Sequence, residues 1–531
     1  MWGLVSTRIA LGFWISAVLS GFHWPAQKQA APRDQEILRI QQLIEGRAFA
    51  SAHAELAEAL KRHPGDEGLE NLLGVVEAQE GNYAAAEASF QRAVARSPKF
   101  TGAYLNLGRL YQEHAGKDPG ALPKALDVYR RVLAYEPGNS EAHYQSASLL
   151  LRQHKYQESL HHLSLLPSDL AATAQALAIQ CGDYAGLQQS AETTKAASRL
   201  AASADLSEPD VQQSLLGLVP AKRDDLTVSL LESLRKRQPL SPELLQTLGL
   251  AYDRTSRLPE AREALEAAFA GDGSSFELLW NLARVAHRQK DYQGALGYLA
   301  HARDLQPANA AVHYYFGLVC IDLNLIAEAR NSFEKAVQLE PESPEYNYAM
   351  GAASAFRHDP ADAVPYFEKY LRLKPQDPRG KLALGAAYFR AKDYEHALPW
   401  LTQSANDPLT STRSHYYLGA IALHDGESER AFSELQQALK AKPDFADALA
   451  EMGQYYIVQR DYPEAEKWIQ HALAVSPDHY SANFYLLTLY TRTKDERQAA
   501  QAKRFDELKK LMDERTQEFL RIVDVQPFGS P

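Results

Sequence analysis

The amino-acid sequence predicts an all-α protein, built as an α-solenoid in two arrays that end in a C-terminal capping helix. The main evidence is that alanine, glycine and proline each recur with a 34-residue period and keep one common phase. Internal repeats of this length are typical of stacked helix pairs. The composition, 45% hydrophobic and 23% charged, excludes a fibrous or wholly disordered chain.

The three columns differ in length but share their phase. The alanine column holds Ala261, Ala295, Ala329, Ala363, Ala397, Ala431, Ala465 and Ala499. The glycine column holds Gly249, Gly317, Gly351, Gly385, Gly419 and Gly453, with Ala283 in the remaining slot. The proline column holds Pro239, Pro307, Pro341, Pro375, Pro443 and Pro477, with Gly273 and Leu409 in its other two slots.

The apolar residues between these columns have helical spacing, which predicts two amphipathic helices in each repeat. We expect glycine at position 8 and alanine at position 20 because the two helices cross closely there. A larger side chain would overpack the crossing, at a cost of about 1–3 kcal/mol. Proline at position 32 ends the second helix, since it cannot continue one. One pair cannot bury its apolar face alone, so the pairs must stack.

These columns resemble the signature of the tetratricopeptide repeat family, whose unit is two antiparallel helices in about 34 residues. Repeat 446–479 has matching residues at positions 4, 7, 8, 11, 20, 24, 27 and 32: Leu449, Met452, Gly453, Tyr456, Ala465, Ile469, Ala472 and Pro477. Position 4, often tryptophan in the family, is mostly His, Leu or Asn here. The resemblance implies a right-handed superhelix, to which residues 208–523 would contribute nine helix pairs and no strand.

The repeat frame also extends towards the N-terminus. We assign residues 35–207 to an N-terminal array that is degenerate after 140, and 208–495 to a regular C-terminal array. Five residues are inserted in the loop 114–123, and Ser207 marks a helix start at the boundary between the arrays. Neighbouring repeats are expected to interlock less well at 204–208. The charged segment 496–531 is expected to form the capping helix, over 496–523, and a tail.

Residues 1–24 resemble a signal peptide or an N-terminal anchor. Arg8 precedes a charge-free, mostly apolar run that extends from Ile9 to Phe22. A membrane-spanning helix needs about 20 residues, whereas a shorter run behind one basic residue fits a secretory signal. Both cleavage after Ser20 and an uncleaved anchor stay open. With 25–34 as a polar tether, we expect an exported chain, periplasmic or secreted, whose membrane contact is confined to this segment.

Charge and motifs exclude several classes of function. The net charge of −11 argues against nucleic-acid binding, since phosphate neutralisation needs a basic face. The sequence has no phosphate-binding loop, H-E-x-x-H, G-x-S-x-G or C-x-x-C motif, so we expect no enzyme, catalytic residue, cofactor or metal. His154 is expected at an inter-helix turn, and His161 and His162 point about 100° apart, which suits no shared metal. Cys320 is expected to be an inert, buried thiol.

The resemblance also implies a binding surface. In the family, positions 2, 5, 9, 12 and 13 of the inner helix face a concave groove. Position 5 gives a largely aromatic column here: Trp280, Tyr314, Tyr348, Tyr416 and Phe484. The arginines at nearby groove positions are Arg284, Arg288, Arg379, Arg390 and Arg413. Aromatic and arginine side chains are the usual energetic anchors of interfaces. The alternative is that these rings pack between neighbouring repeats.

Two functions fit these observations. The first is a non-enzymatic scaffold or adaptor that binds a protein or peptide segment in its groove, outside the cytoplasm. The second is a recruiting subunit of an envelope glycan-synthesis or polysaccharide-export complex. A pentatricopeptide-type RNA binder is opposed by the 34-residue intervals, the prolines at position 32 and the acidic balance.

Overall fold

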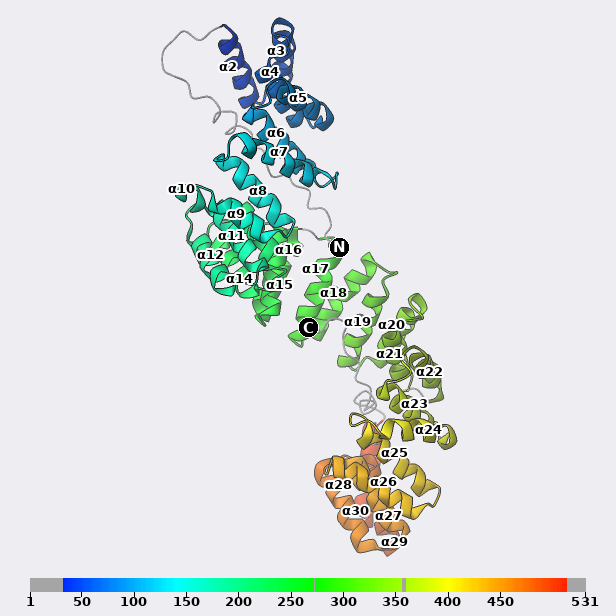
Figure 1. The fold of residues 1–531 in the computed structure, drawn as a ribbon. Helices are drawn as coiled ribbons and strands as arrows, with labels where there is room; N and C mark the ends of the chain where they lie inside the picture. The colour runs from blue at the N-terminus through cyan, green and yellow to red at the C-terminus, as the bar shows by residue number, and fades with distance from the viewer. Residues whose placement is uncertain (1–31, 272, 356–359, 513–531) are drawn as a thin grey trace. The chain divides into compact units, whose positions relative to one another are not determined.

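The computed structural model describes residues 32–271, 273–355 and 360–512. Within these residues it contains 29 α-helices, one 3-10 helix and no strand, which confirms the predicted all-α solenoid (Figure 1). The chain divides into two compact units, Met1–Ala264 and Leu265–Pro531, which we call the N-terminal and C-terminal units. The division lies within α16 (Leu258–Gly271).

The N-terminal unit consists of consecutive helix pairs, with the short helix α10 between the pairs α8–α9 and α11–α12. Its helices are α2 (Pro32–Glu45), α3 (Phe49–Arg62), α4 (Glu67–Gln79), α5 (Tyr83–Arg96), α6 (Thr101–His114), α7 (Ala121–Tyr135), α8 (Ser140–Arg152), α9 (Tyr156–Ser164), α10 (Ser168–Ala171), α11 (Ala174–Gly186), α12 (Ser190–Ala202), α13 (Glu208–Leu218), α14 (Asp224–Arg235) and α15 (Pro242–Arg254). The insertion after α6 lies in the loop before α7, as predicted.

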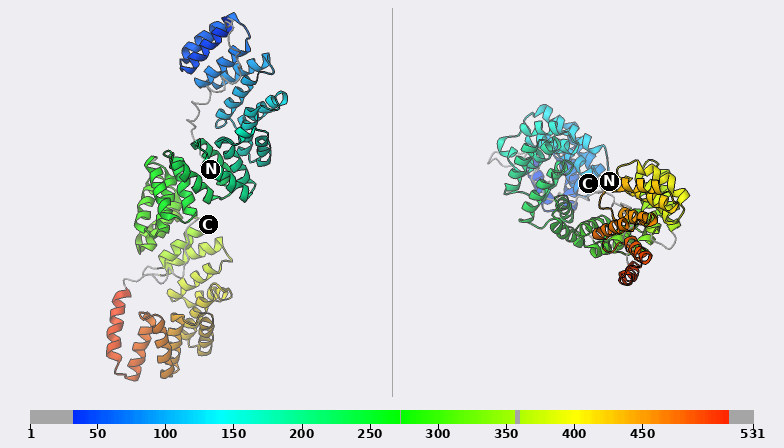
Figure 2. Two further views of the ribbon diagram at one scale, coloured as in Figure 1. Left: turned by 90° about the vertical axis from the view of Figure 1, so that its left-hand side faces the viewer. Right: turned by 90° about the horizontal axis from the view of Figure 1, so that it is seen from below.

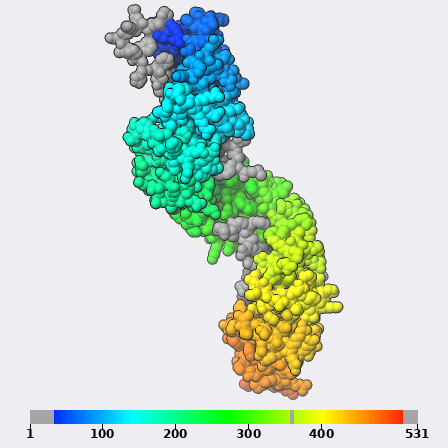
Figure 3. Space-filling model, viewed as in Figure 1, coloured from blue at the N-terminus to red at the C-terminus, as the bar shows by residue number. Residues whose placement is uncertain are grey.

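The C-terminal unit continues the pairs. Its helices are α17 (Phe276–Arg288), α18 (Tyr292–Leu305), α19 (Ala310–Asp322), α20 (Ile326–Leu339), α21 (Pro344–Ser354), η1 (Pro360–Ala363), α22 (Val364–Leu373), α23 (Pro378–Arg390), α24 (Tyr394–Ala405), α25 (Ser411–His424), α26 (Ser428–Ala441), α27 (Ala446–Val458), α28 (Tyr462–Val475), α29 (Tyr480–Thr493) and α30 (Gln498–Met512). From α13 to α30 the described residues form nine pairs, as predicted. Side chains of successive pairs make a continuous surface within each unit (Figure 3).

The close crossing predicted at position 8 is confirmed. A Cβ added to Gly317 of α19 would lie 2.5 Å from the Phe333 ring of α20, and one added to Gly453 would lie 2.4 Å from Ile469. Both distances are well inside van der Waals contact, so each glycine provides the space into which the residue at position 24 packs. The side chain of Phe333 is buried there.

A further column, defined by backbone conformation, lies in the turns between paired helices. One residue per repeat has a left-handed backbone there. From residue 154 onward its described members keep the 34-residue period and skip one undescribed slot: His154, Gln188, Lys222, Ser256, Lys290, Asn324, Lys392, Gly426, Arg460 and Lys494. The slot at 358 lies outside the described residues. The period is therefore unbroken through 140–207, where the sequence columns decay, and these residues form the pairs α8–α9 and α11–α12.

Histidine and asparagine at position 4 have a structural role that the sequence analysis did not identify. His143 and His313 each place Nε2 2.8–2.9 Å from the carbonyl oxygen of the proline six residues earlier. Asn347 and Asn483 donate to the equivalent proline carbonyl through Nδ2, at 2.9 and 3.1 Å. In these four repeats the turn before the inner helix thus gains a partner for the proline carbonyl group.

Close packing joins the two arrays that the sequence analysis separates at 207/208. A Cβ added to Gly217 of α13 would lie 1.9 Å from the carbonyl oxygen of Gly182 in α11. These glycines let α11 and α13 approach each other across 204–208, where we expected looser packing. The predicted helix start is confirmed, since Ser207 forms a capping box with Asp210. The signal or anchor segment 1–24 lies outside the described residues, and α2 already begins at Pro32 within the predicted tether.

The capping helix α30 packs against α29, beside which it lies in Figure 2. The Phe505 ring contacts the rings of Tyr480 and Phe484, with centroids 4.9 and 5.6 Å apart, and Leu508 is buried. Ala499 is exposed, whereas the earlier members of its column are buried. The cap therefore presents a different face to its partner than the preceding outer helices do. The rest of the predicted capping segment, 513–523, lies outside the described residues.

Candidate functional site

The predicted aromatic column divides into buried and accessible members. Tyr314 and Tyr348 are only 2% and 7% exposed. The Tyr314 ring contacts Tyr346 at 5.0 Å between centroids, and Tyr348 contacts Tyr370 at 4.8 Å. Burial raises the pKa of Tyr314. These two rings pack between neighbouring helices, as the alternative reading of the column expects, and offer little surface to a partner.

The more exposed members are Trp280, Tyr416 and Phe484. Trp280 still contacts Tyr315, and Tyr416 contacts Phe445, with ring centroids 5.3 and 5.6 Å apart. Burial also raises the pKa of Tyr416. Trp280 and Tyr416 are half-buried, and Phe484 is 46% exposed. Phe484 lies on the last inner helix, α29, where the Phe505 ring of the cap contacts it, with centroids 5.6 Å apart, and leaves it partly exposed. The structure thus leaves aromatic surface at three separated points of the C-terminal unit, and direct contact of these rings with a partner stays a prediction.

The predicted arginines also differ in their partners. Arg379 donates to Asp377 at the start of its own helix, with Nη2 2.9 Å from Oδ2. Burial acts to raise the pKa of Asp377, but hydrogen bonds from Arg379 and Tyr370 outweigh it and lower that pKa to about 2. The Arg379 charge is therefore compensated within the chain. Arg413 of α25 is half-buried and makes no hydrogen bond or ion pair within the described residues.

Two of the other three arginines lie nearer the surface. Arg288 and Arg390 are exposed, and Arg284 is half-buried. Arg284 Nη1 lies 3.5 Å from Asn281 Oδ1. Although part of the Arg390 side chain is exposed, the protein atoms around its guanidinium partly desolvate it and lower its pKa. The arginines are thus spread over α17, α23 and α25 and form no single basic patch.

A cluster that sequence reasoning missed lies next to Tyr416. Tyr485 of α29 donates to Glu451 of α27 at 2.8 Å, and His479 Nε2 lies 3.0 Å from Asp447 Oδ1. Burial raises the pKa of Glu451 to about 7, and Asp447 adds to the rise. Glu451 occupies a repeat position where other units carry Asn, Tyr or Ala, and this departure was the signal available in the sequence.

The histidines and cysteines form no metal site within the part of the chain that the structure describes. His154 lies in the turn after α8, as predicted. His162 meets His143, with 2.9 Å between the two Nδ1 atoms, and burial lowers the pKa of His162 to about 4. Cys320 is buried as predicted, and burial raises the pKa of its thiol to about 12.

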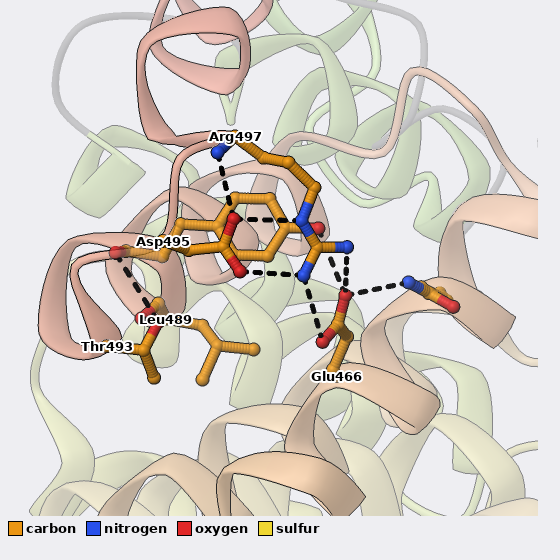
Figure 4. A network of polar contacts seen from close by, with 7 residues as sticks. Glu466, Leu489, Thr493, Asp495 and Arg497 are labelled. Atoms are coloured by element: carbon orange, nitrogen blue, oxygen red, sulfur yellow. Dashed lines mark hydrogen bonds and ion pairs between the residues drawn. The ribbon is translucent and has the colours of Figure 1, made fainter.

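A cavity of about 250 Å³ lies beside the turn between α29 and α30. Figure 4 shows Arg497 bridging Asp495 and Glu466, with both N–O distances 2.7 Å. The guanidinium also lies 4.3 Å from the centre of the Tyr490 ring. Hydrogen bonds from Arg497 lower the pKa of Asp495 to about 2. The polar groups beside this cavity bind one another. These contacts link the turn before α30 to α28 and so hold the capping helix in place.

The repeats match two family models. One model of the tetratricopeptide repeat matches residues 41–100, 247–310 and 348–409, and a second matches 286–353 and 422–489. Together they cover more than half of the chain. The chain belongs to the tetratricopeptide repeat family. Tetratricopeptide repeats build scaffolds that generally bind protein partners and are generally non-catalytic.

Solved structures of low sequence identity are also similar. MamA from Desulfovibrio magneticus RS-1 is 20% identical over 31% of this chain and 92% of its own, with a TM-score of 0.30. The Cut9–Hcn1 hetero-tetramer of the APC/C matches at 13% identity over 87% and 96%, with a TM-score of 0.34. Yeast Tom70 matches at 15% over 85% and 97%, with a TM-score of 0.34. No curated protein matches the chain.

None of the helices within residues 32–512 that the structure describes has the length and apolar character of a membrane span. The apolar run at 9–22 lies outside these residues.

Proposed function

We propose that this tetratricopeptide repeat protein is a non-enzymatic scaffold that binds a protein segment along the inner helices of repeats 276–492, outside the cytoplasm. The observation that carries the proposal is the accessible aromatic and arginine surface of those helices: half-buried Trp280 and Tyr416, exposed Phe484 and unpaired Arg413. Solenoids use such extended surfaces to bind chain segments. Buried Tyr314 and Tyr348 would support this surface from beneath.

The export proposal depends on the sequence of residues 1–24 alone. A fusion of residues 1–40 to a reporter that is active only after export would test it. Activity is expected with the natural segment and not when the run 9–22 is interrupted by two lysines. A silent natural fusion would refute the location.

Binding is tested by capture from the envelope of the source cell with the full chain as bait. Tyr416→Ala and Phe484→Ala should each weaken recovery of the captured protein, because aromatic truncation at an interface typically costs about 2 kcal/mol or more. Val475→Ala removes an exposed apolar side chain from an outer helix and serves as the matched control. A glycan synthase or export channel among the captured proteins would favour the recruiting-subunit alternative. Equal recovery with all three variants would contradict groove binding.

A further inference from the structure

Two carboxyl groups of α27 face α29 in the C-terminal unit, where these two inner helices contact each other (Figure 1). Asp447 and Glu451 are four residues apart, so they lie on successive turns of one helix face. Tyr485 of α29 donates to Glu451, at 2.8 Å, and His479 Nε2 lies 3.0 Å from Asp447 Oδ1. Glu451 is only 9% exposed. Two carboxyl groups, one of them buried, are thus held together at this helix interface.

The histidine of this cluster carries no positive charge. Its Nδ1 accepts a hydrogen bond from the backbone N–H of Ala482, at 3.1 Å, and so caps the start of α29. A ring nitrogen that accepts has no hydrogen of its own, so the one N–H of the ring is at Nε2, which donates to Asp447. Protonation of His479 would put a hydrogen on Nδ1 and break this cap. His479 therefore supplies a hydrogen bond and no counter-charge.

The helices packed against α27 supply no counter-charge for Glu451 either. Within the described residues, α25, α26 and α28 contribute no charged group that acts on its carboxyl. Tyr416 of α25 is a further titratable neighbour, and burial raises the pKa of both phenols, Tyr416 and Tyr485, so that both stay neutral. Arg413, also on α25, forms no ion pair with either carboxyl within the same residues.

A carboxyl in these surroundings is stabilised by holding a proton. Burial, with a further contribution from Asp447, raises the pKa of Glu451 to about 7 against the opposing hydrogen bond from Tyr485. Loss of the proton would place a second negative charge beside Asp447, where little water reaches it. The unfolded chain releases this proton near its ordinary pKa of 4.5. The stabilisation is therefore complete below that pH and is lost as the pH rises through about 7.

The last repeat is the part of the array that this interface controls most directly. Each repeat of a solenoid contacts only its neighbours, and α29 is the last inner helix, followed only by the cap α30 among the described helices. We propose that Glu451 is a proton-controlled latch, which holds α29 and α30 against α27 while it is protonated and loosens them when it ionises. The latch is a property of the fold and does not require the groove proposed for repeats 276–492 to bind a partner.

Hydrogen exchange of the α29 amides in the full chain tests the latch, with each observed rate compared with the intrinsic rate at the same pH. Protection in the natural chain should fall about tenfold from pH 6 to pH 8. Glu451→Gln keeps an acceptor for Tyr485 but cannot ionise, so its α29 protection should be nearly equal at the two pH values. Tyr485→Phe should move the midpoint of the fall to higher pH, because the hydrogen bond that it removes favours the ionised carboxylate.

Glu429→Gln is the matched control, because Glu429 is an exposed glutamate on the outer helix α26. It should keep the fall of the natural chain. Asp183→Asn should keep it as well, since Asp183 is a buried carboxyl on α11 of the N-terminal unit. Equal α29 protection at pH 6 and pH 8 in the natural chain would overturn the proposal. A fall of the same size in Glu451→Gln would also overturn it, because another group would then be responsible.

Discussion

Replacing Gly317 by alanine probes the helix crossing on which every repeat depends. The new Cβ would lie 2.5 Å from Cε1, 2.7 Å from Cδ1 and 3.0 Å from Cζ of Phe333. The Phe333 side chain is buried, so it can retreat only by disturbing its neighbours. Overpacking of this kind costs about 1–3 kcal/mol. Alanine in a helix gains about 1 kcal/mol over glycine, which offsets part of that cost.

Gly297→Ala is the matched control, since Gly297 lies within α18 and an added Cβ meets no atom within 4 Å. It should stabilise the protein by up to about 1 kcal/mol. The difference between the two variants isolates the steric cost, about 1–3 kcal/mol. The double variant Gly317→Ala with Phe333→Leu copies the buried pair Ala283 and Leu299 found at the same positions of repeat 276–309. It should therefore recover part of the loss.

Urea unfolding followed by circular dichroism measures these differences. Repeat arrays can unfold in parts, so hydrogen exchange of the α19 and α20 amides should accompany it. Faster exchange in Gly317→Ala and partial recovery in the double variant are expected. The reasoning is refuted if Gly317→Ala is as stable as Gly297→Ala.

Three further predictions concern other parts of the fold. Burial raises the pKa of Asp183 to about 8, so its folded form holds a proton that the unfolded chain releases near pH 4. Stability should then fall as pH rises from about 4 to 8, and Asp183→Asn should flatten part of that fall in unfolding measured at both ends. Gly217→Ala should cost about 3 kcal/mol or more in urea unfolding, because its Cβ would meet the Gly182 carbonyl. Lys290 has φ +62°, a left-handed backbone that glycine adopts more easily than lysine. Lys290→Gly should therefore leave the free energy of unfolding nearly unchanged or raise it by up to about 1 kcal/mol, which a thermal melt would show as an equal or higher melting temperature.

The repeat columns predicted the helix pairs because packing between the paired helices restricts which residues can occupy these positions. Gly317, for example, must be small where Phe333 crosses it, and such a requirement repeats with the fold. In 140–207 the same slots hold Ser159 and Thr193, which are buried but polar, so the period was not visible there. The turn residues keep the 34-residue period through this region, but they share a positive φ angle rather than a residue type, so the sequence alone does not show it.

The candidate site was predictable in position but not in exposure. The repeat period identifies which residues occupy position 5. Whether their side chains are buried depends on the residues that the neighbouring helix packs against them. Tyr314 meets Tyr346 and is covered, while Phe484 lies on the last inner helix and remains accessible. The partner of Arg379, two residues earlier in the chain, was likewise a local contact that the repeat pattern does not encode.

Photo-crosslinking in the source cell tests the central claim, that the inner helices of the C-terminal unit bind a protein segment. A photoreactive phenylalanine analogue would replace Tyr416 or Phe484 on inner helices, and Leu305 or Val475 on outer helices. The account predicts a crosslink to the same partner protein from both inner positions and none from the outer ones. Crosslinks from the outer positions alone would contradict it.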